Sequence, residues 1–308
     1  MLSVAAPAFA SDKPSAPPAT APAAPDYSWQ DKLERHTGVV TLLGSGAKLN
    51  LGEEYYFLDE AASHKVLVQG WGNPADAAGG VLGMIFPTRF KPMDDQAWGA
   101  VITYQDVGYV SDKDARKTDY DKLLNDLRKG EDDDNAERQK AGYSAVHLVG
   151  WAERPTYDAA HHVVIWARDL KFADTKADML NYDIRVLGRK GVLSLNVVSS
   201  LSDLPEVRAA AGKIAGTAAF DSGSTYADYK KGDDKVAEYG VAGLIAAGVG
   251  VAAAKKLGLL ALVFVALKKG AVLLVAGFAS LVAWFRKTFG GGKSVGKDKT
   301  PGGDNLIS

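Results

Sequence analysis

The chain divides into a long first part of alternating apolar and polar residues and a C-terminal quarter of apolar blocks. In the first part, short runs rich in β-branched and aromatic residues are bounded by turn residues, which is typical of antiparallel strands. The turns at residues 44–46 and 188–191 predict two tight hairpins. A hairpin is predicted within residues 38–51. Further strands are predicted at residues 81–86, 98–104, 145–152, 163–170, 180–187 and 192–198.

Three helices are predicted beside these strands. Residues 58–69 form a short helix, and residues 120–138 are polar with leucines at helical spacing, which predicts an amphipathic helix. Ser202 is predicted to cap a last, alanine-rich helix that runs to about Ala219. Consecutive strands joined by short turns, with helices between groups of strands, predict an α+β fold with an antiparallel sheet and flanking helices.

The C-terminal quarter holds three apolar blocks, at residues 239–254, 257–267 and 270–285, separated by Lys255-Lys256 and Lys268-Lys269. The sixteen residues of the last block would rise about 24 Å as a helix, slightly less than the roughly 30 Å hydrocarbon core. Flanking lysines can extend their charged ends to the membrane surface, so this block can span the bilayer. A single helix over residues 257–285 would instead bury Lys268-Lys269 in lipid, at a cost of about 3 kcal/mol per charge. The sequence therefore predicts C-terminal transmembrane helices within a membrane-anchor region, residues 236–287, with the number of spans left open.

Small residues recur every four positions in the first block, at Ala242, Ala246, Gly250 and Ala254. Such a ridge lets two helix backbones approach closely in lipid. It predicts membrane-helix packing, either within the chain as a hairpin or between chains. The alternative interpretation is a helix that is merely rich in alanine and glycine.

The remaining segments predict export. Residues 1–10 end in an Ala-Phe-Ala triplet typical of a signal-peptide cleavage site, although the usual basic start is missing. Residues 11–26 are a Pro/Ala linker, residues 27–230 the folded domain and residues 288–308 a flexible basic tail. The positive-inside rule places this tail in the cytoplasm, and hence the domain outside the cytoplasmic (inner) membrane.

Composition and motifs give no catalytic site, cofactor or metal. A net charge of −1 offers no electrostatic reason to expect nucleic acid, and the absence of cysteine excludes thiolate chemistry. The adjacent His161 and His162 fit an exposed turn better than a metal site. Asp112, Asp114 and Asp119 resemble a calcium loop only loosely, and a cap for a helix that begins near Asp119 explains them better.

Long stretches of the chain carry a family resemblance. They are WGNP at residues 71–74, TYQDVGYVSDKDA at 103–115, LVGWAERPTYDAA at 148–160, LNYDIRVLGRKGVLSLN at 180–196 and YADYKKGDDKVAEYGVAGLIAAG at 226–248. These stretches resemble the bacterial membrane-anchored proteins of domain of unknown function 2167, over about residues 27–289. The resemblance implies a signal peptide, an extracytoplasmic domain and a C-terminal anchor, and it brings no catalytic residues.

Three functional hypotheses follow. The favoured one is a non-enzymatic envelope protein that binds a partner or ligand outside the cytoplasmic membrane, with the lipid bilayer and an envelope protein or a second copy of the chain as partners. The second is an envelope hydrolase that uses Asp106, Asp112 or Asp158 with a nearby histidine. The third is a structural protein whose membrane helices self-associate.

Overall fold

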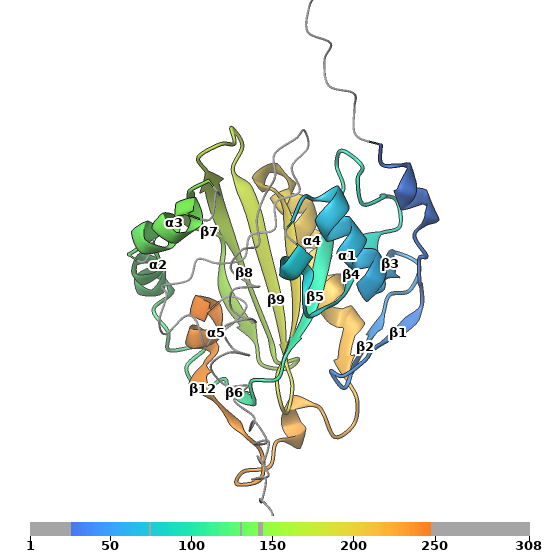
Figure 1. The fold of residues 1–308 in the computed structure, drawn as a ribbon. Coiled ribbons are helices and arrows are strands. Elements are labelled where there is room, and N and C mark those ends of the chain that lie inside the picture. The colour runs from blue at the N-terminus through green and yellow to red at the C-terminus, as the bar shows by residue number, and fades with distance from the viewer. Residues whose placement is uncertain (1–25, 74, 130, 141–143, 248–308) are drawn as a thin grey trace, which may run out of the picture.

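A seven-stranded antiparallel sheet forms the centre of the molecule, with strand order β3-β4-β5-β10-β9-β8-β7 (Figure 1). The computed structural model describes residues 26–73, 75–129, 131–140 and 144–247. The strands of the central sheet are β3 (Tyr55–Leu58), β4 (Val81–Pro87), β5 (Gly99–Gln105), β7 (Val146–Asp158), β8 (Val163–Phe172), β9 (Met179–Leu187) and β10 (Val192–Ser200).

Two small sheets complete the β structure. The first joins β1 (Val39–Leu42), β2 (Ala47–Asn50) and β11 (Ala218–Phe220). In the second, β12 (Val236–Gly240) pairs in parallel with β6 (Tyr109–Ser111). This second pair brings the end of the described chain back beside the middle of the sequence.

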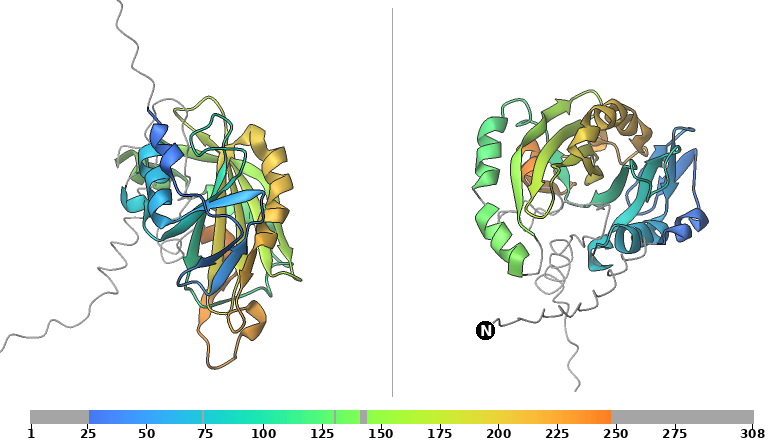
Figure 2. Two further views of the ribbon diagram at one scale, coloured as in Figure 1. Left: turned by 90° about the vertical axis from the view of Figure 1, so that its right-hand side faces the viewer. Right: turned by 90° about the horizontal axis from the view of Figure 1, so that it is seen from above.

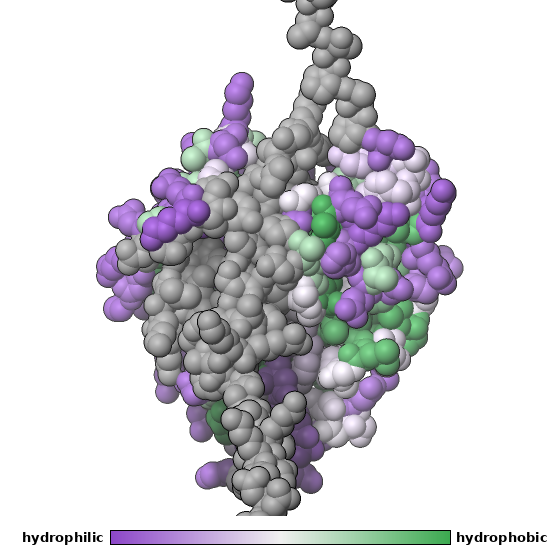
Figure 3. All heavy atoms as spheres, in the orientation of Figure 1, coloured by the Kyte–Doolittle hydropathy of each residue, from purple (hydrophilic) through white to green (hydrophobic). Residues whose placement is uncertain are grey.

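Helices cover both faces of the central sheet (Figure 2). Helix α4 (Leu204–Thr217) packs on one face, while α1 (Glu60–Lys65) and α5 (Val241–Ala247) pack on the other. Helices α2 (Tyr120–Arg128) and α3 (Glu131–Lys140) lie along β7, and hydrophilic side chains dominate their outer surface (Figure 3). The short helical turns are η1 (Ser28–Lys32), η2 (Val66–Gly70), η3 (Ala75–Ala78), η4 (Leu201–Asp203) and η5 (Tyr226–Asp228).

The two-residue period of the strands divides the core between the two faces. On β9, Leu180, Tyr182 and Ile184 are buried against α4, which contributes Val207 and Ile214. The alternate residues of β9 therefore point to the opposite face, which α5 partly covers.

The predicted strands and both hairpins are confirmed, whereas two helix predictions need correction. The single helix expected over residues 120–138 is two helices, α2 and α3, and the sequence between them contains glycine, a poor helix former. Ser202 is not the cap of the last helix. Ser200 instead forms a capping box with Asp203, and α4 begins at Leu204 with a proline in its first turn.

The start of the predicted membrane-anchor region belongs to the packed domain. Strand β12 and α5 cover residues 236–247, and Val241, Leu244 and Ile245 on α5 are fully buried against the sheet. Among the described residues, no helix combines the length and apolar character that a membrane span requires. The rest of the apolar blocks, like residues 1–25, lies outside the described residues, so the transmembrane helices and the signal peptide stay predictions.

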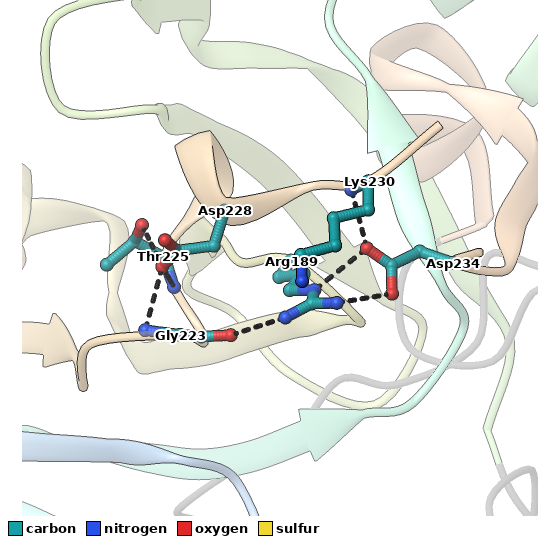
Figure 4. A network of polar contacts seen from close by, with 6 residues as sticks. All are labelled: Arg189, Gly223, Thr225, Asp228, Lys230 and Asp234. Atoms are coloured by element: carbon teal, nitrogen blue, oxygen red, sulfur yellow. Dashed lines mark hydrogen bonds and ion pairs between the residues drawn. The ribbon is translucent and has the colours of Figure 1, made fainter. Parts of the chain in front are cut away.

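An ion-pair network fixes the segment that leads into β12 (Figure 4). Arg189, in the β9–β10 turn, donates from Nε and Nη2 to the two carboxylate oxygens of Asp234 at 2.8 and 2.9 Å. These bonds, together with one from the backbone N–H of Lys230, lower the pKa of Asp234 to about 2. Asp228 accepts hydrogen bonds from the backbone and hydroxyl of Thr225. The network therefore holds β12, and with it α5, against the end of the central sheet.

Candidate functional site

Polar side chains gather at the centre of the sheet face opposite α4. Arg185 on β9 lies in register with Ser194 on β10, and the next row pairs Asp183 with Asn196 and Trp166. We call the whole set the polar array. Its members come from β5, β8, β9, β10 and β12, and are Thr103, Gln105, Trp166, Arg168, Asn181, Asp183, Arg185, Ser194, Asn196 and Tyr239.

A chain of hydrogen bonds connects part of the polar array. Arg185 Nη2 donates to Asp183 Oδ1 at 2.6 Å, and Asn196 Nδ2 donates to the same oxygen at 2.8 Å. Asn181 Nδ2 then donates to Asn196 Oδ1 at 3.1 Å. The Arg185 guanidinium also lies 5.4 Å from the centroid of the Trp166 ring, a cation–π distance. These contacts fix Arg185 and Asp183 in place.

Helix α5 contacts the polar array through its backbone. Arg168 Nη2 donates to the carbonyl oxygen of Ile245 at 2.6 Å. The other end of α5 is held by Asp114, whose carboxylate accepts from the backbone N–H groups of Val241 and Ala242. This anion at the helix N-terminus satisfies donors that have no partner within the helix.

Many polar atoms of the array are buried without a partner among the described residues. They are Nε and Nη1 of Arg185, Nε of Arg168, Nε1 of Trp166, both amide atoms of Gln105 and the hydroxyls of Thr103, Ser194 and Tyr239. Only three other such atoms occur in the described parts of the chain, so the unpaired groups are concentrated here. Each one costs about 1–3 kcal/mol, and such groups are rare in folded proteins. Their concentration marks the array as the candidate site.

The array carries more positive than negative charge. Arg168 and Arg185 are 4% and 0% exposed, and Asp183 is the one carboxylate in the set. Burial lowers the pKa of Arg168, and nearby Arg185 acts in the same direction against the attraction of Asp183. Burial also raises the pKa of the Tyr239 hydroxyl, while Arg185 opposes that rise. A buried surplus cation is unfavourable unless another group balances it.

Two of the four small residues predicted to pack membrane helices lie on α5. Ala242 and Ala246 are half-buried on α5, whereas Gly250 and Ala254 lie outside the described residues. Their role in helix packing therefore stays a prediction.

The acidic residues that the sequence analysis named lie in different local environments. Asp119 caps α2 by accepting from the N–H groups of Asp121 and Lys122, as predicted. Asp158 binds His161 Nδ1 at 2.6 Å in an exposed turn, and Asp106 is exposed after β5. No group of acids and histidines able to hold a metal ion occurs within the described residues.

Asp112 and His162 meet through a tyrosine. The Tyr157 hydroxyl donates to Asp112 Oδ2 at 2.7 Å and lies 3.0 Å from His162 Nδ1. His162 has a φ of 55°, and its ring centroid lies 4.2 Å from that of Tyr226. The contacts join the β7–β8 turn to β6 and η5. They hold three segments together. The hydrolase hypothesis stays a prediction for Asp106, Asp112 and Asp158 alike.

One protein family matches the part of the chain that contains the polar array. The family model described as "Protein of unknown function (DUF2167)" matches residues 34–279. The chain belongs to the DUF2167 family. The match confirms the resemblance to domain of unknown function 2167, while the membrane anchoring that the resemblance implied stays a prediction. The matched range includes every residue of the polar array. No curated protein matches this DUF2167 protein.

Two solved structures are similar to this DUF2167 protein at low identity. The solution structure of cyanobacterial PsbP (CyanoP) from Synechocystis sp. PCC 6803 has 8% identity and a TM-score of 0.34, covering 61% of this chain and 92% of that one. The crystal structure of PA94, a protein of unknown function from Pseudomonas aeruginosa, has 14% identity and a TM-score of 0.23, covering 58% and 92%. These TM-scores are too low to support an argument about function.

Proposed function

We propose that this DUF2167 protein is a non-enzymatic envelope protein, anchored to the cytoplasmic membrane by its C-terminal region, whose domain binds a ligand or partner outside that membrane. The observation that supports binding is the polar array, where buried donors without a partner among the described residues are concentrated on one sheet face. Preorganised polar groups of this kind give a binding site its specificity. The hydrogen bonds among Asp183, Arg185 and Asn196 keep them in place.

The proposed anchor begins beside the proposed binding site. Arg168 of the array binds the carbonyl oxygen of Ile245, two residues before the end of α5. The apolar sequence continues from α5 through the lysine-separated blocks. A ligand on the array would therefore lie next to the end of α5, after which the proposed anchor continues.

The location is tested by reporters fused after Lys235, Lys269 and Lys293. We expect the Lys235 fusion to be active outside the cytoplasm and the Lys293 fusion inside it, because the basic tail follows the positive-inside rule. The Lys269 fusion then gives the number of spans. A Lys235 fusion that is active only in the cytoplasm would contradict the proposal.

The binding role is tested by photocrosslinking in intact cells. We expect p-benzoylphenylalanine in place of Tyr239 to form a covalent adduct on illumination, because the Tyr239 hydroxyl belongs to the array and has no partner in the described parts of the chain. The matched control places the same probe at Leu43, which is 82% exposed in the β1–β2 turn. Mass spectrometry identifies the adduct. If neither position 239 nor position 105, which also belongs to the array, gives an adduct that is absent from position 43, the binding role is wrong.

A further inference from the structure

The unpaired atoms of the polar array are mostly donors. Arg185, Arg168 and Trp166 together present four ring or guanidinium nitrogens that can only donate. The hydroxyls of Ser194, Thr103 and Tyr239 can donate or accept. Among the array atoms that no described residue pairs, the Gln105 carbonyl oxygen is the one that can only accept. A group that completes these bonds must therefore supply acceptors.

The charge of the array points in the same direction. The array holds two guanidinium groups and one carboxylate, and Asp183 Oδ1 already accepts from both Arg185 and Asn196. A metal cation or an amine would face two buried positive charges. A neutral ligand could accept hydrogen bonds but would leave the surplus charge unbalanced.

We propose that the polar array binds an anion that carries a carboxylate or phosphate group, with the free nitrogens of Arg185 and Arg168 as its main contacts. Charge-assisted hydrogen bonds to guanidinium are among the strongest in proteins, and they are strengthened where water is excluded. The indole N–H of Trp166 and the Ser194 hydroxyl supply further donors from the strands on either side of β9. This inference rests on the proposed function, since it names the ligand class of the same site.

The anion has two possible sources, a soluble metabolite or a lipid headgroup, and calorimetry of the full chain in nonionic detergent separates them. Inorganic phosphate and citrate are the soluble probes. Phosphatidylglycerol added to the micelles is the lipid probe, with phosphatidylcholine as its zwitterionic control. Saturable heat with phosphate or citrate identifies a soluble anion, and saturable heat with phosphatidylglycerol alone identifies a headgroup.

Variants then assign the binding to the array. We expect Arg185→Gln to raise the Kd at least about tenfold, because it removes a buried charge that contacts the anion. Trp166→Phe keeps an aromatic ring, removes one donor and is expected to raise the Kd about fivefold. It serves as the test if Arg185→Gln fails to fold. The matched control is Arg208→Gln, which removes a guanidinium paired with Glu153 on the α4 side and should leave the Kd unchanged.

The inference is overturned if no probe binds the wild-type chain. It is also overturned if Trp166→Phe and every folded Arg185 variant bind with the wild-type Kd. An adduct at position 239 that forms undiminished in saturating phosphate, citrate and phosphatidylglycerol would reject the anion while leaving the binding role intact. Absence of any adduct, as described above, rejects both.

Discussion

Replacing Asp183 by alanine is expected to lower the free energy of unfolding by about 3–5 kcal/mol, because the change leaves a buried arginine without its carboxylate. Asp183 is 1% exposed, and Arg185 is fully buried. The lost carboxylate also strands the Asn196 amide, which donates to the same oxygen. Urea unfolding of the full chain in nonionic detergent, followed by tryptophan fluorescence, measures the loss.

The control for this prediction is Asp126→Ala, which breaks exposed ion pairs with Lys122 on α2 and with Lys129 directly after it. We expect Asp126→Ala to leave the unfolding curve almost unchanged, since exposed pairs contribute little. A loss below about 1 kcal/mol for Asp183→Ala would show that the array is open to water. The inference of a buried charge surplus would then be wrong.

A double variant separates stability from binding at the same positions. Asp183→Leu combined with Arg185→Met replaces the ion pair by apolar side chains of similar size. Such replacements of buried pairs are often neutral or stabilising, so we expect the double variant to recover most of the stability that Asp183→Ala loses. Because the guanidinium is gone, the recovered protein should still fail to bind the anion. If Asp183 and Arg185 served stability alone, the double variant would not separate the free energy of unfolding from anion binding.

The strands could be predicted because their alternation is local, but the polar array could not. Asn181, Asp183 and Arg185 alternate with apolar residues, and the same pattern describes any strand with one solvated face. What makes this face a candidate site is its burial, and that depends on pairing β5 with β10 and on packing α5 over the sheet. Both contacts join segments far apart in the sequence.

The position of α5 was also beyond sequence reasoning. Residues 241–247 are as apolar as a membrane segment, and their Ala/Gly content fits helix packing in lipid. Asp114 favours the packing of α5 on the sheet over its insertion in lipid, because it caps this helix from more than 120 residues away. The cap at Asp119 could be predicted from the sequence because its partners are its neighbours. The cap at Asp114 could not, because the helix that it caps is distant in the sequence.

Replacing Leu244 by alanine is expected to lower the free energy of unfolding by about 2–5 kcal/mol, the usual cost of emptying a buried leucine site. Leu244 is fully buried on α5, in the cluster that also contains Val164 and Trp166. The cost arises only if α5 packs on the sheet, because alanine in lipid leaves no such cavity. Urea unfolding of the full chain in nonionic detergent measures it.

The matched control is Leu43→Ala, which removes the same atoms from an 82% exposed side chain and should change the free energy of unfolding by less than about 0.5 kcal/mol. If Leu244→Ala proves equally neutral, the helix is not part of the domain, and the apolar block from residue 239 onward is free to enter lipid as a whole. If it destabilises as expected, the membrane-anchor region can begin only after residue 247. Under the proposed anchoring and binding, the first apolar block would then join the array to the membrane, and an anion on the array would bind next to that connection.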